Sequence, residues 1–234
     1  MTMRRAVLIA GLAGLAAVTT ACGVGGYASE DSVSYDVPDK VAALRVTTDS
    51  GTIEVVGSDR EGVHVTERLQ WRKEKPATSH DVRGDTLELT FTCPTVWGLG
   101  AAGVTCDVSY RVEVPKATRL KLTSDSGDVT LIGVAGDVEV TSDSGSIKGD
   151  ELTGKRVVTK SDSGDVKLAF AGPPDALTTE TDSGDTQVRV PDGPYRITAR
   201  TDSGDKDIKT AGDAKAPRTI QLTSDSGDLE LAPA

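Results

Sequence analysis

The chain has 234 residues, with 36 acidic and 26 basic side chains and a formal net charge of −10. A protein that binds nucleic acid through phosphates needs a basic face, so this charge balance argues against that class. Two Trp, two Phe and four Tyr are too few for an enzyme with a large core and an aromatic-lined pocket. The repeated alternation of Val, Leu, Ile and Thr argues against a disordered chain.

Residues 1–21 have the layout of a secretory signal peptide. Two arginines precede an apolar run of 13 residues, 6–18, which is too short to cross a hydrocarbon core of about 30 Å as a helix. The small residues before Cys22 resemble a bacterial lipobox, in which the cysteine is diacylated and becomes the mature N-terminus. The resemblance implies a protein anchored by lipid on the extracellular face of the cell membrane. Thr19 departs from the usual aliphatic residue of a lipobox, and the alternative is ordinary signal cleavage and secretion.

Residues 22–40 show no apolar periodicity and are predicted to be a tether between the membrane and the folded part. Residues 41–119 contain period-2 segments at 85–91 and 108–114 and are predicted to form less regular β-coils. This stretch holds both tryptophans, and Trp71 is expected to cover the first coils.

Cys93 and Cys106 are the two cysteines that remain if Cys22 carries lipid. They are 13 residues apart, and an exported protein sits where a disulfide persists. A disulfide that closes so short a loop stabilises the fold by roughly 3 kcal/mol in the chain-entropy model. The alternative is a pair of reduced, buried cysteines. Trp97 lies inside the loop and either covers neighbouring coils or contacts a ligand or partner.

The tripeptide Asp-Ser-Gly occurs seven times, and from the second copy onward its spacings are 18, 19, 20, 20 and 23. A branched aliphatic residue stands five places before each Asp, and Ser or Thr stands directly before it. Further apolar residues mostly recur four and six places after it. This period of two predicts a short strand on each side of every motif.

A unit of about 19 residues with two short strands cannot bury its apolar face alone, so the copies are expected to stack. The sequence therefore predicts an all-β protein, a parallel β-solenoid with a narrow aliphatic core. Residues 120–234 are expected to form its regular coils, placed one after another in chain order.

The repeated Thr/Ser-x-Ser-Gly-Asp-Val-x-Leu units, together with the segment Tyr-Arg-Val-Glu-Val-Pro at 110–115, resemble bacterial β-strand-repeat proteins known as the "putative adhesin" family. The resemblance covers roughly residues 40–232. It implies a β-solenoid on the cell envelope, and it brings no catalytic residues with it.

Stacked motifs would place their aspartates in a column with a spacing of about 4.8 Å. Like charges directly opposite each other on neighbouring strands destabilise a sheet, so something must offset the repulsion. Calcium bound by carboxylates and turn carbonyls is one solution. The alternative is turn chemistry, in which Asp and Ser bond nearby backbone groups and Gly takes a positive φ. The candidate calcium ligands are Asp125, Asp143, Asp162, Asp182, Asp202 and Asp225.

The sequence offers no enzyme site. Seven equivalent serines cannot each be a nucleophile, and only His64 and His80 are available as a base. We therefore expect a non-enzymatic, lipid-anchored surface protein that contacts an envelope protein or glycan and binds no nucleic acid. The alternatives are a calcium-stabilised spacer without a specific ligand and, less favoured, a glycan-acting solenoid enzyme.

Overall fold

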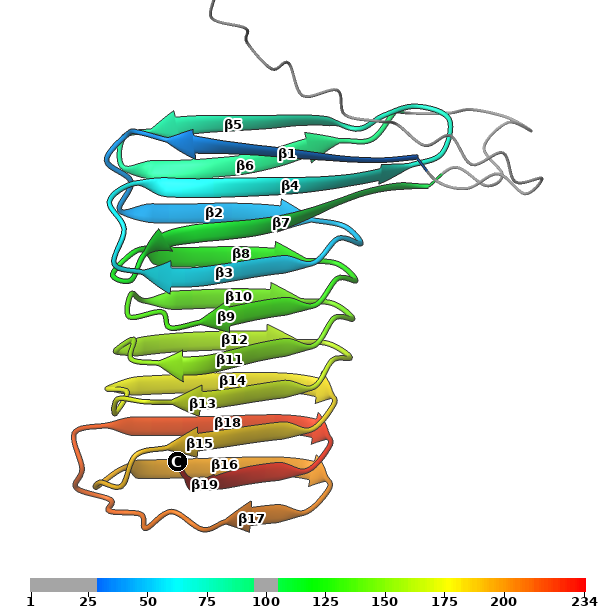
Figure 1. Cartoon of the computed structure of the whole chain (residues 1–234). Helices are drawn as coiled ribbons and strands as arrows, with labels where there is room; N and C mark the ends of the chain where they lie inside the picture. Colours follow the sequence, from blue (N-terminus) through cyan, green and yellow to red (C-terminus); the bar gives the residue numbers. More distant parts are fainter. Residues whose placement is uncertain (1–28, 95–104) are drawn as a thin grey trace, which may run out of the picture.

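The computed structural model describes residues 29–94 and 105–234. All regular secondary structure in these residues is β-strand, arranged as two sheets that face each other across a narrow core (Figure 1). The predicted signal peptide, Cys22 and Trp97 lie outside the described residues. Within the described part of the chain, no helix is long and apolar enough to cross a membrane.

Each regular coil contributes one strand to each sheet, and an Asp-Ser-Gly corner joins the two strands. Neighbouring coils pair in parallel and in register; Val138, for example, lies between Leu120 and Val157. The inward rows are buried, so the period-2 prediction is confirmed. The coils are β2 (Ala43–Thr48) with β3 (Ile53–Ser58), β8 (Arg119–Ser124) with β9 (Val129–Ile132), β10 (Val138–Ser142) with β11 (Ile147–Leu152), β12 (Arg156–Ser161) with β13 (Val166–Phe170), β14 (Ala176–Ser183) with β15 (Thr186–Val190), β16 (Arg196–Ser203) with β17 (Lys206–Ile208), and β18 (Thr219–Ser226) with β19 (Leu229–Pro233).

Five further strands build the N-terminal end of the stack: β1 (Ser29–Val37), β4 (Val63–Trp71), β5 (Ala77–Arg83), β6 (Thr86–Thr92) and β7 (Cys106–Pro115). The pair β6 and β7 forms an eighth coil, parallel to β2 and β3. The other three strands run antiparallel to their neighbours: β4 joins β7, β1 joins β4, and β5 joins β6. The expectation of coils throughout 41–119 is therefore wrong for β4 and β5.

The predicted tether is also too long, because residues 29–37 form strand β1 at the edge of one sheet. Tyr35 and Val37 alternate with polar residues and point inward, where Val37 is only 3% exposed. Three apolar residues at alternate positions, beginning with Val33, were the sequence signal for this strand.

The coils do not stack in chain order at the C-terminal end. Strand β18 lies between β14 and β16, and β19 lies between β15 and β17 (Figure 1). The last coil of the chain is thus inserted, and the coil that precedes it in sequence is displaced to the end of the stack. The expectation of sequential stacking for residues 120–234 is wrong at this point.

The residues at the inward positions explain why the last coil of the chain is inserted and the preceding coil lies at the end of the stack. In the inserted coil, Leu222, Leu229 and Leu231 are at most 1% exposed. In the terminal coil, Lys206 stands in register with Leu229, at a position that points into the core elsewhere in the stack. A lysine is almost never fully buried without a partner. At the end of the stack its ammonium group stays in water, and Lys206 is exposed there.

The corner glycines form a column in which each backbone touches the next. A Cβ added to Gly145 would lie 2.1 Å from the carbonyl oxygen of Gly127, and one on Gly164 would lie 2.1 Å from that of Gly145. These glycines have no positive φ, so close approach and not backbone conformation requires them. Among the corner glycines, only Gly184, Gly204 and Gly227 have a positive φ. The expectation from turn chemistry that the corner glycine takes a positive φ is therefore wrong for the other corners.

Our first prediction concerns this column. Replacing Gly145 by Ala should lower the free energy of unfolding by about 1–3 kcal/mol, because the new methyl group meets a backbone oxygen that cannot rotate away. Gly212→Ala is the matched control, since its Cβ would meet nothing closer than 3.8 Å. Urea unfolding followed by circular dichroism compares the two. Equal stability of both variants would contradict the steric account.

Our second prediction tests the inserted coil by disulfide trapping. Thr178 and Gln221 are in-register neighbours on β14 and β18, so their Cα atoms lie about 4.8 Å apart, within disulfide range. The pair Thr178→Cys with Gln221→Cys should oxidise readily in a Cys22→Ser background. Thr178→Cys with Thr198→Cys should not, because β18 separates these strands by about 9.6 Å. Efficient bonding of 178 to 198 would show sequential stacking instead.

Candidate functional site

All seven Asp-Ser-Gly corners lie along one edge of the stack, which we call the corner edge. Backbone hydrogen bonds continue through the corners: the Ser144 N–H donates to the Asp125 carbonyl at 2.9 Å, and the Ser163 N–H donates to the Asp143 carbonyl at 2.9 Å. The two sheets are therefore joined at this edge by a third ladder of parallel backbone bonds. The corners behave as a rigid surface and not as loops.

At six of the seven corners the Ser or Thr before the Asp donates its hydroxyl to a backbone carbonyl from inside, whereas the Ser224 hydroxyl has no partner among the described residues. The Ser142 hydroxyl donates to the Gly145 carbonyl at 2.8 Å and accepts the Gly145 N–H at 2.9 Å. Ser161 and Gly164 repeat this arrangement at 2.9 Å for both bonds. The recurring hydroxyl residue thus satisfies backbone groups that would otherwise be buried without partners.

Two columns of aspartate follow the corner edge, and they differ in their contacts. The second column, three residues after the motif Asp, is structural. The Asp165 carboxylate accepts the backbone N–H of Asp185 at 3.1 Å, the Asp185 carboxylate accepts that of Asp228 at 2.9 Å, and the Asp228 carboxylate accepts that of Asp205 at 2.8 Å. Each of these aspartates therefore holds the adjacent coil through its side chain as well as through the backbone.

The first column, the motif aspartates, has no such role. These side chains are exposed, and none of them makes a hydrogen bond or ion pair with any other described residue. The column consists of Asp49, Asp125, Asp143, Asp162, Asp182, Asp225 and Asp202, in the order of the stack.

Calcium at these aspartates gains no support from the geometry. Within residues 29–94 and 105–234, no group of three or more His, Cys, Asp or Glu side chains is arranged to hold a metal ion. The hydrogen bonds of the corner already satisfy backbone groups through the Ser or Thr hydroxyl, which supports that part of the turn-chemistry alternative. The expectation that the motif aspartate bonds the backbone is wrong, since its side chain makes no such bond among the described residues.

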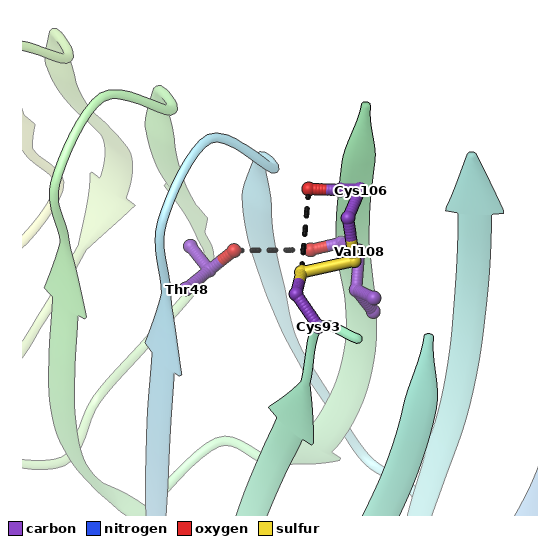
Figure 2. The surroundings of a disulfide bond; sticks show 4 residues. All are labelled: Thr48, Cys93, Cys106 and Val108. Carbon is purple, nitrogen blue, oxygen red and sulfur yellow. Dashed lines mark hydrogen bonds between the residues drawn. A yellow bond between two sulfur atoms is a disulfide. The ribbon is translucent and has the colours of Figure 1, made fainter. Parts of the chain in front are cut away.

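The predicted disulfide is confirmed and stands at the same edge. Cys93 and Cys106 are bonded with an S–S distance of 2.09 Å, at the point where β6 and β7 would otherwise be joined by a corner (Figure 2). The Thr48 hydroxyl donates to the Val108 carbonyl at 3.0 Å, as the serines of other coils do to glycine. The disulfide therefore joins the ends of β6 and β7 at the place where other coils have a corner, and Trp97 lies outside the described residues.

Burial raises the pKa of Asp107, beside this disulfide, and the negative charge of Asp49 raises the pKa further. Its Oδ1 is buried and has no hydrogen-bond partner among the described residues. Because the folded-state pKa lies above the unfolded one, ionised Asp107 opposes folding at neutral pH. That cost disappears as the pH falls below the unfolded-state pKa.

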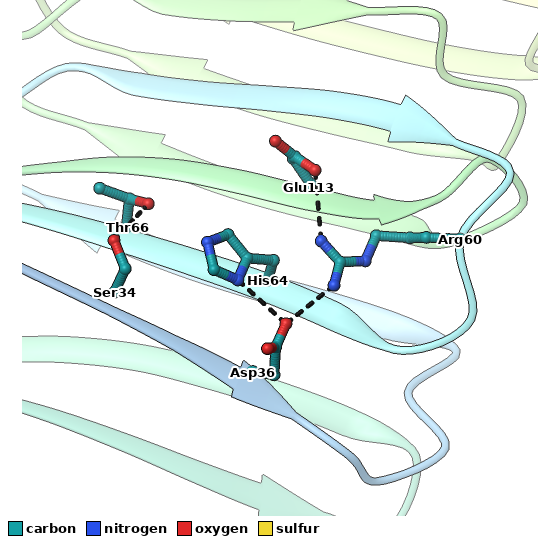
Figure 3. A network of polar contacts seen from close by, with 6 residues as sticks. All are labelled: Ser34, Asp36, Arg60, His64, Thr66 and Glu113. Atoms are coloured by element: carbon teal, nitrogen blue, oxygen red, sulfur yellow. Dashed lines mark hydrogen bonds and ion pairs between the residues drawn. The ribbon is translucent and has the colours of Figure 1, made fainter. Parts of the chain in front are cut away.

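A polar network on the outer face of β1 and β4 involves one of the two histidines (Figure 3). The Asp36 carboxylate lies 2.9 Å from His64 Nδ1 and 2.8 Å from Arg60, and these two contacts lower the pKa of Asp36. Arg60 also reaches Glu113 at 3.2 Å. The hydroxyl of nearby Ser34 is bonded to Thr66 at 2.9 Å. The imidazole is therefore held by a carboxylate on an exposed sheet, with no activated hydroxyl beside it.

The second histidine, His80, is exposed at the N-terminal end of the stack and contacts a partly buried tyrosine there. Glu67 is only 2% exposed and accepts the Tyr35 hydroxyl at 2.7 Å. Burial and this carboxylate raise the pKa of Tyr35, whose ring stacks on His80 with centroids 4.5 Å apart. The sequence analysis did not identify Glu67. Its position between Val65 and Leu69 in an alternating segment was the available signal.

Stacked two-strand coils, aligned corners and an antiparallel N-terminal end define a β-solenoid-like protein built from strand repeats. The chain belongs to the Toastrack DUF4097 family, whose match spans residues 100–232, more than half of the sequence. No curated protein matches the chain.

Solved structures similar to the chain include the following two. A "putative cell adhesion protein" from Clostridium sporogenes ATCC 15579 has 14% identity and a TM-score of 0.54, with 88% of this chain and 100% of that chain covered. A "putative adhesin" from Bacteroides fragilis NCTC 9343 has 15% identity and a TM-score of 0.49, with 88% and 98% covered. At this identity the first likeness shows a shared fold, and the second adds no argument.

Our third prediction separates the two aspartate columns. Asp165→Ala should cost about 1 kcal/mol, because the Asp185 N–H loses its acceptor, whereas Asp165→Asn keeps an oxygen there and should cost less. Asp162→Ala, three residues earlier in the exposed column, should change stability by no more than about 0.5 kcal/mol. Chemical denaturation measures all three. A larger loss for Asp162→Ala than for Asp165→Ala would reverse the assignment of structural roles.

Proposed function

We propose that the protein is a non-enzymatic surface protein, held by lipid at Cys22, that binds an envelope component along the corner edge. The main support is the motif-aspartate column. Its seven carboxylates point into water, have no partner among the described residues, and repel one another along the stack. The fold uses the corner glycine, the Ser or Thr before the motif aspartate and, where the corner has one, the second aspartate, and it makes no use of the motif-aspartate side chains.

The disulfide between Cys93 and Cys106 supports the same edge as the contact surface. It joins the two strands of the coil next to the first Asp-Ser-Gly corner. Exposed segments held on a rigid scaffold are where binding residues concentrate. Trp97, which lies between the two cysteines in the sequence, is the contact residue we propose, since aromatic side chains dominate the energetics of interfaces. The partner we propose is an envelope protein or glycan.

The name of the Clostridium sporogenes structure, a "putative cell adhesion protein", supports the same class of function, a protein at the cell surface. Within the described residues the hollows are open grooves lined by sheet faces or turns, and none gathers a nucleophile, a base and an oxyanion site. The proposal is therefore one of binding and display, without chemistry.

Our fourth prediction concerns the anchor. Cys22→Ser should move the protein from the membrane fraction to the soluble fraction, because the residue that would carry the lipid is lost. Fractionation followed by mass spectrometry of the N-terminal peptide measures both location and lipid. Unchanged membrane association of the variant, with no lipid on the wild-type peptide, would refute lipid anchoring.

Our fifth prediction concerns the corner edge. The Cys22→Ser protein should co-sediment with isolated envelopes of the producing bacterium. Asp162→Asn with Asp182→Asn should weaken this binding several-fold, since interface charges contribute about 0.2–1 kcal/mol each when exposed. Both aspartates point into water, so folding should be unaffected.

The control is Asp137→Asn with Asp192→Asn, which makes the same charge change in the turns of the opposite edge. It should bind envelopes like the parent. Absence of binding by the parent would favour a spacer without a ligand. An equal loss in both double variants would show that net charge, and not the corner edge, controls association.

A further inference from the structure

A shallow groove crosses the outer face of the sheet that contains β9, β11, β13 and β15. Its volume is about 290 Å³. Three basic side chains line it, Lys148, Lys167 and Arg189, together with the polar side chains of Thr130 and Gln187. We call these five residues the cationic groove. The groove was not predicted from the sequence, because the residues between the inward positions were considered only as outward-facing.

An irregularity in β11 and a small residue in β13 shape the groove. The pairing of β11 with β13 shifts register between Gly149 and Leu152, and Glu151 has a positive φ of 53°. This bulge turns the strand locally. On the next coil, Ala169 is paired with Arg189, so a methyl group lies beside a long basic side chain. The groove therefore lies between the two lysines and Arg189.

The charges in the groove are not balanced across strands, unlike two cross-strand pairs on the opposite sheet. On the opposite sheet, Lys121 pairs with Glu139 and Lys160 pairs with Glu180, each at 2.6 Å on the adjacent strand. In the groove, Lys148 lies directly opposite Lys167. Two like charges in such a pair destabilise the sheet, so the fold gives no reason for them.

The nearby carboxylates do not neutralise these cations. Asp150 lines the groove and keeps its negative charge, but among the described residues its carboxylate accepts the Glu151 N–H at 3.0 Å and forms no ion pair with a groove cation. Asp165 reaches Lys167 only at 3.8 Å. Among the described residues, neither Lys148 nor Arg189 takes part in any hydrogen bond or ion pair. A chain with a net charge of −10 thus keeps a local excess of positive charge in a groove.

We propose that the cationic groove binds an acidic glycan, a linear sugar chain that carries carboxylate or phosphate groups. Lys148 and Lys167 are in register on adjacent strands, about 4.8 Å apart along the stack, and Arg189 lies on the third strand, two residues further along it. Cations spread over three coils suit a chain of several anionic groups better than one small anion. Lysine ammonium groups and the arginine fork pair with carboxylate and phosphate oxygens, and the Thr130 hydroxyl and Gln187 amide can bond sugar hydroxyls.

A single-stranded nucleic acid is also a polyanion, but the groove does not suit it. Proteins that bind single strands stack bases on aromatic side chains, and no aromatic residue lines this groove. The inference goes beyond the proposed function, because it concerns a sheet face and not the corner edge. Its test uses purified components, so it can fail independently of envelope binding.

The experiment measures binding of the full Cys22→Ser chain to two probes by isothermal titration calorimetry. The probes are polygalacturonate, which carries carboxylates, and phosphomannan, which carries phosphates; dextran is the neutral control and a single-stranded DNA oligomer is the competing polyanion. The protein as a whole repels polyanions, so binding requires a local site. We expect binding to at least one acidic glycan, weakened by salt, and none to dextran. The glycan that binds more tightly identifies the anionic group.

Lys148→Gln with Lys167→Gln should reduce the affinity roughly tenfold, since each exposed ion pair contributes up to about 1 kcal/mol. The same variant should keep or raise the melting temperature, because it removes a like-charge pair. Lys121→Gln with Lys160→Gln makes the same charge change on the opposite sheet and should bind like the parent. Absence of glycan binding, an equal loss in both variants, or tighter binding of DNA than of either glycan would overturn the proposal.

Discussion

The architecture depends on one steric constraint, the contact between the backbone of one corner and the glycine of the next. Along the stack each corner glycine lies against the carbonyl of its neighbour, and a Cβ at these positions would fall 1.9–2.6 Å from that oxygen. The contact allows only one relative placement of successive coils. Because the strands on both sides leave from the corner, their register follows, and every inward aliphatic residue lies above another. The exposed aspartates are aligned by the same contact.

The two ends of the stack close the core and the sheet edges in different ways. At the C-terminal end, the coil with Lys206 at an inward position is placed last, and the apolar coil of Leu222 and Leu229 is inserted before it. The outer edge strand there carries Arg196 and Arg200, charges of the kind that discourage pairing with another chain. At the other end, antiparallel strands β1 and β5 close the sheets, and Tyr35 stacked on His80 covers the core between them.

Much of this arrangement could be predicted from the sequence, because local periodicity and motif alignment report directly on which face a residue occupies. The aligned apolar positions, which include Leu122, Val140 and Ile147, predicted the core, and the number and spacing of the cysteines predicted the disulfide. The order of the coils could not be predicted in this way. The sequence pattern does not favour one order of the last two coils over the other, because coils with similar motifs can pair equally well. The cost of burying Lys206 distinguishes the two orders. The groove depends on a bulge at 149–152, which leaves no clear trace in the pattern.

The account assigns the Asp-Ser-Gly motif to a rigid corner whose exposed side chains are supported by a continuous backbone ladder. Amide hydrogen exchange tests this claim most directly. The Ser144 and Ser163 amides donate to carbonyls of the adjacent coil, so they should exchange as slowly as amides in the middle of β10 and β12, although their side chains are exposed. Rapid exchange at these two amides, with slow exchange in the flanking strands, would show that the corners are flexible loops and would contradict the account.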